Sequence, residues 1–188
     1  MRLTLLQQVP PRPVVLVQSA GGIPKDAESG TTEQARGDPE RMRVYLGSDH
    51  AGFQMKEALK PYLEGRGLKV HDVGTASEDS VDYPDFAEKV AHGVADGDAD
   101  CGVLVCGSGI GMAMAANKVD GVRAAMVTDA ELARMMRRHN DANVITLGGR
   151  YITRQLAEEI LSAFFDTEFE GGRHQRRVDK IAALEDDN

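Results

Sequence analysis

A single thiol, Cys106, lies where an apolar stretch meets a glycine-rich segment, and this junction is the part of the chain best suited to chemistry. The residues before it, 103–105, form the continuous apolar run typical of a central parallel strand. Glycines at Gly107, Gly109 and Gly111 permit positive φ and close approach of the backbone to a ligand. The Ala- and Met-rich stretch that follows predicts a helix, whose N-terminus favours negative charge. A thiol beside such a turn is a candidate catalytic group.

The turn matches none of the common phosphate-binding motifs. A dinucleotide fingerprint needs a third glycine where Met112 stands, and it would follow the first strand rather than the third. A nucleophile elbow centred on Ser108 needs glycines at positions 106 and 110. A phosphatase loop needs an arginine at position 112, and a Walker loop needs a Lys-Ser or Lys-Thr pair. Because glycine-rich strand-to-helix turns are common in α/β proteins, the turn alone also fits a purely structural role.

The composition indicates one globular domain. At 188 residues the chain is long enough for a single well-packed core and short for two ordinary domains. No apolar run approaches the ~20 residues of a membrane span, and nothing resembles a secretory signal. Residues 42–188 carry the whole net charge of −8, which argues against nonspecific nucleic-acid binding. We therefore expect neither a membrane nor a nucleic acid as partner.

The two cysteines, Cys101 and Cys106, lie on or beside one predicted strand. Their spacing places the Cα atoms about 16 Å apart, beyond the roughly 7 Å that a disulfide allows. Free thiols are typical of a reducing compartment, so we expect a cytoplasmic protein.

The first 41 residues differ from the rest of the chain. They hold five of the seven prolines and show no sustained helical or strand period, which is typical of disorder. A second Met-Arg pair, Met42-Arg43, directly precedes the first good strand. We expect residues 1–41 to be a disordered or non-native N-terminal extension and residues 42–188 to form the single domain.

Strand and helix patterns alternate from Met42 onward. Strands are predicted at 43–47, 68–73, 101–106, 122–127 and 143–147, and helices near 52–64, 84–96, 110–118, 129–138, 153–165 and from about 173. This alternation predicts an α/β fold, a doubly wound, Rossmann-like three-layer sandwich with a five-stranded parallel sheet and an extra C-terminal helix. Thr128 and Glu131 form a candidate capping box for the fourth helix. Pro61 predicts a kink or an early end of the first.

Ligands bind beyond the carboxyl ends of the strands in such sheets. Candidate residues follow most strands: Asp49 and His50, Tyr83, Cys106, Arg150 and, at the end of the fourth helix, His139 and Asn140. Taken singly, each has an ordinary explanation, such as a helix cap for Asp49 or surface charge for Arg150. We expect these segments to converge on one edge of the sheet. Two basic clusters, at 134–139 and 173–177, suit a small anionic ligand.

Seven motifs, in order along the chain, resemble those of the type B ribose-5-phosphate isomerases. They are G-S-D-H-A-G at 47–52, D-Y-P at 82–84, C-G-S-G-I-G at 106–111, A-A-N-K at 115–118, R-H-N-D at 138–141, G-G-R at 148–150 and G-G-R-H-Q-R-R at 171–177. The resemblance covers Met42 to about Leu184 and extends to the galactose-6-phosphate and allose-6-phosphate isomerases. Residues 1–41 have no counterpart in it.

The resemblance implies aldose–ketose isomerisation of a phosphosugar through an enediolate, in the pentose phosphate pathway, with no metal or other cofactor. Cys106 would be the base, as in the branch of the family that uses this cysteine; another branch uses a glutamate at the position of Met112. A helix N-terminus and an amide nest favour the thiolate that a base requires. Ser108 would relay a proton between O1 and O2. The developing oxyanion would be held by backbone N–H groups of Gly107, Ser108, Gly109, Ile110 and Gly111.

The resemblance also implies roles for the remaining candidates. His139 would be the acid that opens the furanose ring, since a helix C-terminus favours the imidazolium. Asp49 would contact the sugar or support that step. Substrate binding would also involve His50, Tyr83, Asn140, Arg150, Arg173 and Arg177, with His174 assisting. Because Arg173 and Arg177 are four apart, a helix would present both on one face to a phosphate.

In the family the C-terminal segment reaches into the neighbouring subunit's site, which implies a homodimer or a dimer of dimers with a shared site. Besides ribose 5-phosphate, allose or galactose 6-phosphate remains open as the substrate. A non-catalytic phosphosugar-binding protein and a redox protein using Cys106 are the alternatives of other classes. The intact set Asp49, Cys106, Ser108 and His139 argues against the first, and the lack of a C-x-x-C pair argues against the second.

Overall fold

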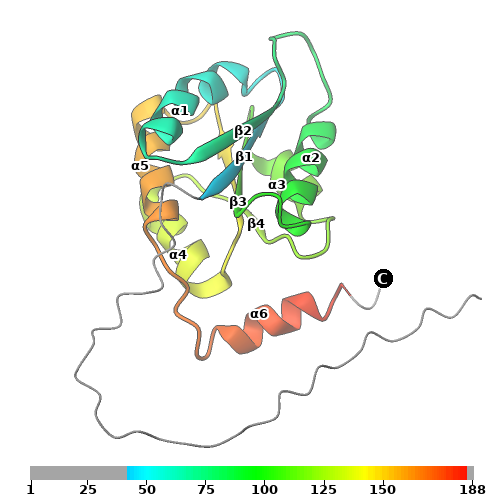
Figure 1. The fold of residues 1–188 in the computed structure, drawn as a ribbon, viewed down its shortest axis with the longest axis vertical. Helices are drawn as coiled ribbons and strands as arrows, with labels where there is room; N and C mark the ends of the chain where they lie inside the picture. The colour runs from blue at the N-terminus through cyan, green and yellow to red at the C-terminus, as the bar shows by residue number, and fades with distance from the viewer. Residues whose placement is uncertain (1–41, 186–188) are drawn as a thin grey trace, which may run out of the picture. The chain divides into compact units, whose positions relative to one another are not determined.

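The buried apolar runs of the chain pair into a parallel sheet that forms the middle layer of the fold (Figure 1). The computed structural model describes residues 42–185. The strands are β1 Arg43–Ser48, β2 Lys69–Gly74, β3 Cys101–Cys106, β4 Ala124–Met126 and β5 Val144–Gly148. Their order is β2-β1-β3-β5-β4, and every pair is parallel. The predicted five-stranded parallel sheet is therefore confirmed.

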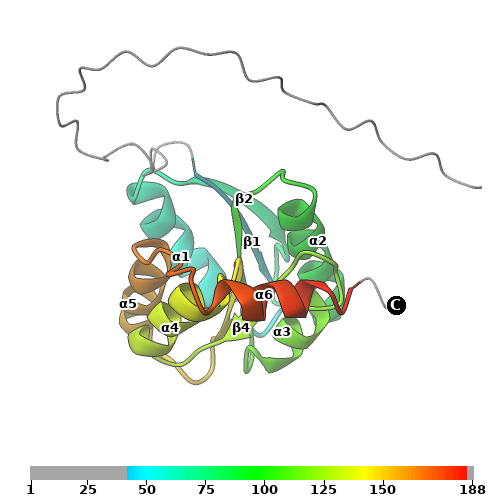
Figure 2. The ribbon, with the colours of Figure 1, turned by 90° about the horizontal axis from the view of Figure 1, so that it is seen from below.

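Helices cover both faces of this sheet. They are α1 Phe53–Gly65, α2 Tyr83–Ala95, α3 Ile110–Ala116, α4 Ala130–Asn140, α5 Arg154–Phe165 and α6 Gln175–Ala182. Figure 2 shows α1, α4 and α5 on one side of the sheet and α2 and α3 on the other. Successive β3 side chains alternate between the two cores: Val103 and Val105 pack with α1, α4 and α5, whereas Leu104 and Cys106 pack with α2 and α3. All of β3 is consequently buried, as its apolar sequence predicts.

The sheet reverses its winding between β1 and β3. The connection from β1 leads through α1 to β2 at one edge, and the connection from β2 returns through α2 to β3 on the other side of β1. The loop that leaves β1 leads to α1 and the loop that leaves β3 leads to α3 on the opposite face, so the two loops diverge beyond the strand ends. Such a switch point is where doubly wound sheets bind ligands.

Helix α6 lies at the other end of the sheet. In Figure 1 it runs along the end opposite to the carboxyl ends of the strands, and in Figure 2 it crosses in front of the sheet. No helix within residues 42–185 is long and apolar enough to cross a membrane. The expected extension at 1–41 lies outside the described residues, so its disorder stays a prediction.

Several local expectations differ from the structure. Helix α1 continues through Pro61 to Gly65, because Leu59 and Leu63 on either side of it are fully buried and their packing offsets the lost hydrogen bond. The cap of α4 is Asp129 rather than Thr128; its carboxylate accepts the N–H of Leu132 at 2.9 Å. Helix α6 begins only after His174, so Arg173 precedes the helix and the argument that Arg173 and Arg177 share a helical face was wrong.

Candidate active site

The carboxyl ends of β1 and β3 lie side by side at the switch point, and the last residue of β3, Cys106, carries the thiol directly before the turn. The Sγ atom of Cys106 accepts the N–H of Gly109 at 3.1 Å, and Cys106 is 5% exposed. Gly109 adopts a φ of +80°, a left-handed conformation that a glycine takes without strain and that turns its N–H back toward the sulfur. The sulfur is thus held by a backbone donor at the carboxyl end of the strand.

The loop after β5 closes one side of this turn. The N–H of Gly149 donates to Cys106 O at 2.8 Å, and the N–H of Arg150 donates to Gly107 O at 3.2 Å. From below, the Thr146 hydroxyl donates to Gly109 O at 2.8 Å. The guanidinium of Arg150 lies against the turn, since a Cβ placed on Gly107 would be 3.6 Å from its Cζ atom. The turn is thus fixed by β5 and has a positive charge beside it.

The β1 end places a buried carboxylate next to the same turn. Asp49 is 7% exposed; its N–H donates to Val105 O at 3.3 Å, and its Oδ1 accepts the N–H of Gly52 at 2.8 Å. The Asp49 carboxylate therefore holds the turn that leads into α1, whose N-cap residue is Gly52, and it also lies where β1 and β3 meet. The neighbouring His50 is held through Nδ1, which lies 3.3 Å from both the N and the O of Val81 in the loop before α2.

Tyr83, the first residue of α2, completes the set. Its ring lies on the turn so closely that a Cβ at Gly111 would be 2.8 Å from the ring carbons, which explains why the turn needs a glycine there. Tyr83 is 41% exposed, so the phenol is accessible to solvent beside the turn. One chain therefore brings together Asp49, His50, Tyr83, the turn 106–111 and Arg150, as predicted.

The other predicted residues lie elsewhere. Helix α4 leaves the carboxyl end of β4 and runs back to the start of β5, so its last residues, His139 and Asn140, lie at the amino edge of the sheet. Helix α6, which contains Arg177 and is preceded by Arg173, lies at that same edge (Figures 1 and 2). The expected convergence of all segments on one edge was wrong for a single chain, because a helix that links parallel strands must travel antiparallel to them.

The amino-edge residues form a second cluster of their own. The rings of His139 and His174 stack with centroids 4.3 Å apart and planes 2° apart. Arg173 donates from Nε to Nε2 of His174 at 3.2 Å, which requires that nitrogen to be unprotonated. Burial lowers the pKa of His174, and the charges of His139, Arg173 and Arg177 lower it further, while Glu170 opposes them. Both the Arg173 contact and the lowered pKa favour the neutral form of His174, whose ring stacks on that of His139.

Within the described part of the chain, one group of three side chains has the atom types and spacing of metal ligands: His139, Glu170 and His174, with ligand atoms within 4.8 Å of one another. The imidazole lone pairs lie in the ring planes, and those planes are parallel. The two histidines therefore suit stacking on each other better than chelation of one ion.

Comparison with known proteins assigns the chain to a family. Residues 44–181 match the Ribose/Galactose Isomerase family. The ribose-5-phosphate isomerase B of Escherichia coli is 43% identical over 143 residues, which are 76% of this chain and 96% of that protein. This chain belongs to the ribose/galactose isomerase family. The matched range includes both clusters, from Asp49 to Arg177.

Solved structures of isomerases from this family have the same fold. That of Clostridium thermocellum ribose-5-phosphate isomerase B has a TM-score of 0.77 and 46% identity, covering 78% of this chain and 99% of that one. That of the Mycoplasma genitalium enzyme, described with bound ribulose 5-phosphate, has a TM-score of 0.75 and 41% identity, covering 78% and 98%. The resemblance seen in the seven motifs is confirmed.

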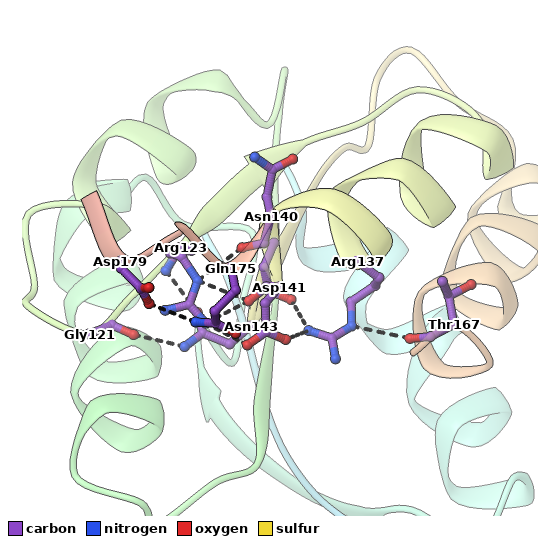
Figure 3. A network of polar contacts seen from close by, with 10 residues as sticks. Gly121, Arg123, Arg137, Asn140, Asp141, Asn143, Thr167, Gln175 and Asp179 are labelled. Carbon is purple, nitrogen blue, oxygen red and sulfur yellow. Dashed lines mark hydrogen bonds and ion pairs between the residues drawn. The ribbon is translucent and has the colours of Figure 1, made fainter. Parts of the chain in front are cut away.

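Sequence reasoning assigned no role to Arg123 or to Asp141, although Asp141 belongs to the quoted R-H-N-D motif. Asp141 directly follows α4 and Arg123 directly precedes β4, and the two bond to each other at the carboxyl end of α4 (Figure 3). The two residues are 18 positions apart in the chain. No periodic pattern or short motif signals such a pairing, and only the fold reveals it.

Proposed function

We propose that this chain is an isomerase that interconverts ribose 5-phosphate and ribulose 5-phosphate, with Cys106 as the base. The observation that carries the proposal is the contact between Cys106 Sγ and the N–H of Gly109, 3.1 Å apart at the switch point. A thiolate held there faces the region in which a doubly wound sheet binds its ligand. The relative described with bound ribulose 5-phosphate supports this choice of substrate.

The proposed reaction begins with ring opening. His139 donates a proton to the ring oxygen O4, the C1–O4 bond breaks, and O1 gives its proton to Asp49, which leaves the open-chain aldehyde. The Cys106 thiolate then removes the C2 proton, and the freed electron pair forms a C1–C2 double bond while O1 becomes negative. Backbone N–H groups of the turn stabilise O1. The thiol returns its proton to C1, and Ser108 passes the O2 proton to O1, which gives the ketose.

The two clusters would meet in a homodimer. One chain presents the base at the carboxyl edge of its sheet, but its own His139, Asn140, Arg173 and Arg177 lie at the amino edge. A second copy, related by a two-fold axis, supplies these residues to the first site and receives the same in return. Such a contact would bury apolar side chains that are exposed in the single chain. They are Ile110 and Met114 on α3 and Ile181 on α6. A dimer of dimers would keep the same shared site.

We further propose that residues 42–188 make up this isomerase domain and that the enzyme acts in the cytoplasm, in the pentose phosphate pathway. The described cysteines, Cys101 and Cys106, are both free and buried, which suits a reducing compartment. The matched residues 44–181 lie inside the proposed domain.

Turnover by the purified full chain tests the assignment. Ribose 5-phosphate, allose 6-phosphate and galactose 6-phosphate are compared, and we expect ribose 5-phosphate to have the highest kcat/KM. Cys106→Ala should lower kcat at least ~10³-fold with little change in KM, because a base acts on the transition state.

Cys101→Ala is the matched control, since it removes a buried thiol from the same strand. It should retain kcat and lose about 1 kcal/mol of stability. Activity of Cys106→Ala within about tenfold of the wild type would place the base elsewhere. A higher kcat/KM for a hexose phosphate would reassign the substrate, and no turnover of any of the three would favour a binding protein.

A further inference from the structure

The carboxyl end of α4 is held by a compact polar network (Figure 3). Asp141 caps the helix with a φ of +45° and is the one non-glycine residue within 42–185 that has a positive φ. Aspartate and asparagine enter this region more readily than other side chains. The chain reverses here from α4 toward β5, directly after His139 and Asn140.

Two arginines hold the Asp141 carboxylate from opposite sides. Arg123 donates from Nη2 to Oδ2 at 3.0 Å, and Arg137 donates from Nη1 to Oδ1 at 3.0 Å. The same guanidinium groups bind the final carbonyls of the turn. Arg123 bonds Asn140 O at 3.0 Å and Asp141 O at 2.7 Å, and Arg137 bonds Ala142 O at 2.6 Å. The carbonyls that a helix end leaves unpaired are thus satisfied by positive charges.

Each arginine is itself anchored to another part of the fold. Arg123 directly precedes β4, and its N–H donates to Oδ1 of Asn143, which directly precedes β5, at 2.8 Å. Arg137 donates from Nε to Thr167 O at 3.4 Å, and its guanidinium lies 5.6 Å from the ring centre of Phe164 in α5. The carboxylate therefore links the end of α4 to both neighbouring segments. Without its charge, two guanidinium groups would face each other across the turn.

The last turn of α4 also carries His139, whose ring packs on His174 at the start of α6. The two stacked rings come from different elements. Arg138 O accepts the N–H of Glu170 at 3.1 Å, which fixes the segment leading to His174. The direction in which His139 points thus depends on how the end of α4 is held against that segment.

We propose that Asp141 is a positioning residue that, through Arg123 and Arg137, holds His139 in the orientation required for ring opening. This inference rests on the proposed function, in which His139 protonates the ring oxygen. Asp141 itself contacts neither the substrate nor the reacting atoms.

Ring opening affects the two directions of the reaction differently. Ribose 5-phosphate is mostly a furanose in solution and must be opened. Ribulose 5-phosphate stays open, because its C5 oxygen carries the phosphate and cannot close a five-membered ring. A misplaced His139 should therefore slow the conversion of ribose 5-phosphate and spare that of ribulose 5-phosphate, whose open-chain product closes in solution. A generally damaged fold would slow both.

The test uses Asp141→Asn in the full chain, which removes the charge and keeps a side chain that tolerates positive φ. At saturating substrate we expect kcat for ribose 5-phosphate to fall at least about tenfold and kcat for ribulose 5-phosphate to change by less than about threefold. The comparison uses kcat because the equilibrium constant fixes the ratio of the two kcat/KM values. The imidazole C–H NMR signal of His139, assigned with His139→Gln, should shift. Asp141→Gly, which also permits the left-handed backbone, should give the same asymmetry and serves if the first variant does not fold.

Asp129→Asn is the matched control, because it makes the same charge change at the opposite end of the same helix. This variant should leave kcat in both directions within about twofold of the wild type and should not shift the His139 signal. An equal loss of kcat in both directions, or no loss of kcat with an unmoved His139 signal, would overturn the proposal. If the wild type fails to convert ribose 5-phosphate, the proposed function fails instead, and the NMR signal alone decides whether Asp141 positions His139.

Discussion

The two thiols of β3 have opposite environments, although they lie at the two ends of one six-residue strand. Burial raises the pKa of Cys101 to about 12; Arg137 opposes this shift and Asp100 adds to it. Cys106 instead ends the strand and receives a backbone N–H at its sulfur. The same side chain is thus an inert packing group at one end of the strand and a candidate base at the other.

Alkylation should distinguish the two thiols. At pH 8 a thiol with a pKa of about 12 is only about one part in ten thousand thiolate, so iodoacetamide should spare Cys101. Cys106 should be modified first, and activity should disappear with the same rate constant. Peptide mass spectrometry over a time course measures both sites. Modification of Cys101 at a similar rate would contradict its assignment as an inert packing group.

At the scale of single residues, the sequence predicted candidate catalytic residues where a reactive side chain adjoins a glycine-rich turn or a strand end. Cys106 with its glycines and Asp49 at a strand end were found in this way. Asp141 was quoted in a motif and given no role, because its function depends on arginines brought to it by folding. A glycine in the sequence suggests a left-handed backbone, whereas an aspartate that adopts one, such as Asp141, cannot be recognised from the sequence.

Elements were predicted well where periodicity is strong and less well at their ends. Strand β4 is only Ala124–Met126, shorter than its apolar run suggested, because at the edge of the sheet it pairs with β5 alone. Helix α1 tolerates Pro61 because tertiary packing outweighs the local cost. Asp129 and Thr128 both have capping side chains, and local sequence does not decide which of two adjacent candidates adopts the extended backbone of a cap.

The join between α1 and β2 depends on one buried cation. Lys56 is 1% exposed, and its Nζ lies 2.6 Å from Asp72 Oδ2, which Lys60 also contacts at 2.8 Å. Asp72→Ala should lower the free energy of unfolding by about 3 kcal/mol, because it leaves a buried ammonium with a poorer set of partners. Lys60→Ala, at a more exposed partner of the same carboxylate, should cost at most about 1 kcal/mol. Denaturant unfolding of both variants measures the difference.

This contribution should also depend on pH. Burial alone would raise the pKa of Asp72, but hydrogen bonds from Lys56, Lys60 and the N–H of Gly74 hold it below its ordinary value. A group whose pKa is lowered by folding stabilises the protein above its unfolded pKa, about 4, and loses that effect as the pH falls through the folded pKa. The stability gap between the wild type and Asp72→Ala should therefore narrow as the pH falls from about 5 to about 2, and a constant gap would contradict this account.

For the whole molecule, the sequence predicted that all candidate residues would meet at one edge of the sheet, and the structure divides them between the two edges. The missing step was the direction of α4. The sequence argument placed the end of α4 at the carboxyl edge of the sheet, where α4 begins. A helix that connects two parallel strands instead carries the chain to the opposite edge. Helix polarity is available from the sequence once the strands are parallel, so this part of the arrangement could have been derived.

A shared site makes a prediction about mixtures of inactive variants. Cys106→Ala and Arg173→Ala should each be nearly inactive, but a mixed dimer has one site with the intact thiol of one chain and the intact arginine of the other. Random exchange in an equal mixture makes half of the dimers mixed, so about a quarter of all sites should recover. Mass spectrometry of tagged chains confirms that exchange has occurred.

Mixing Cys106→Ala with Arg150→Ala provides the control, because Arg150 lies beside the turn of its own chain. No mixed dimer then contains an intact site, and activity should not return. If the Arg173 mixture also stays inactive after exchange, Arg173 serves its own chain and the shared site is wrong.

The run of α4 from one edge of the sheet to the other keeps Cys106 and His139, the proposed base and acid, apart within a single chain. With the proposed shared site, a newly made chain is folded but inactive until it meets another copy. The appearance of turnover after synthesis or refolding should follow second-order kinetics. Near the dissociation constant of the pair, a cell that halves the amount of this chain loses more than half of the activity.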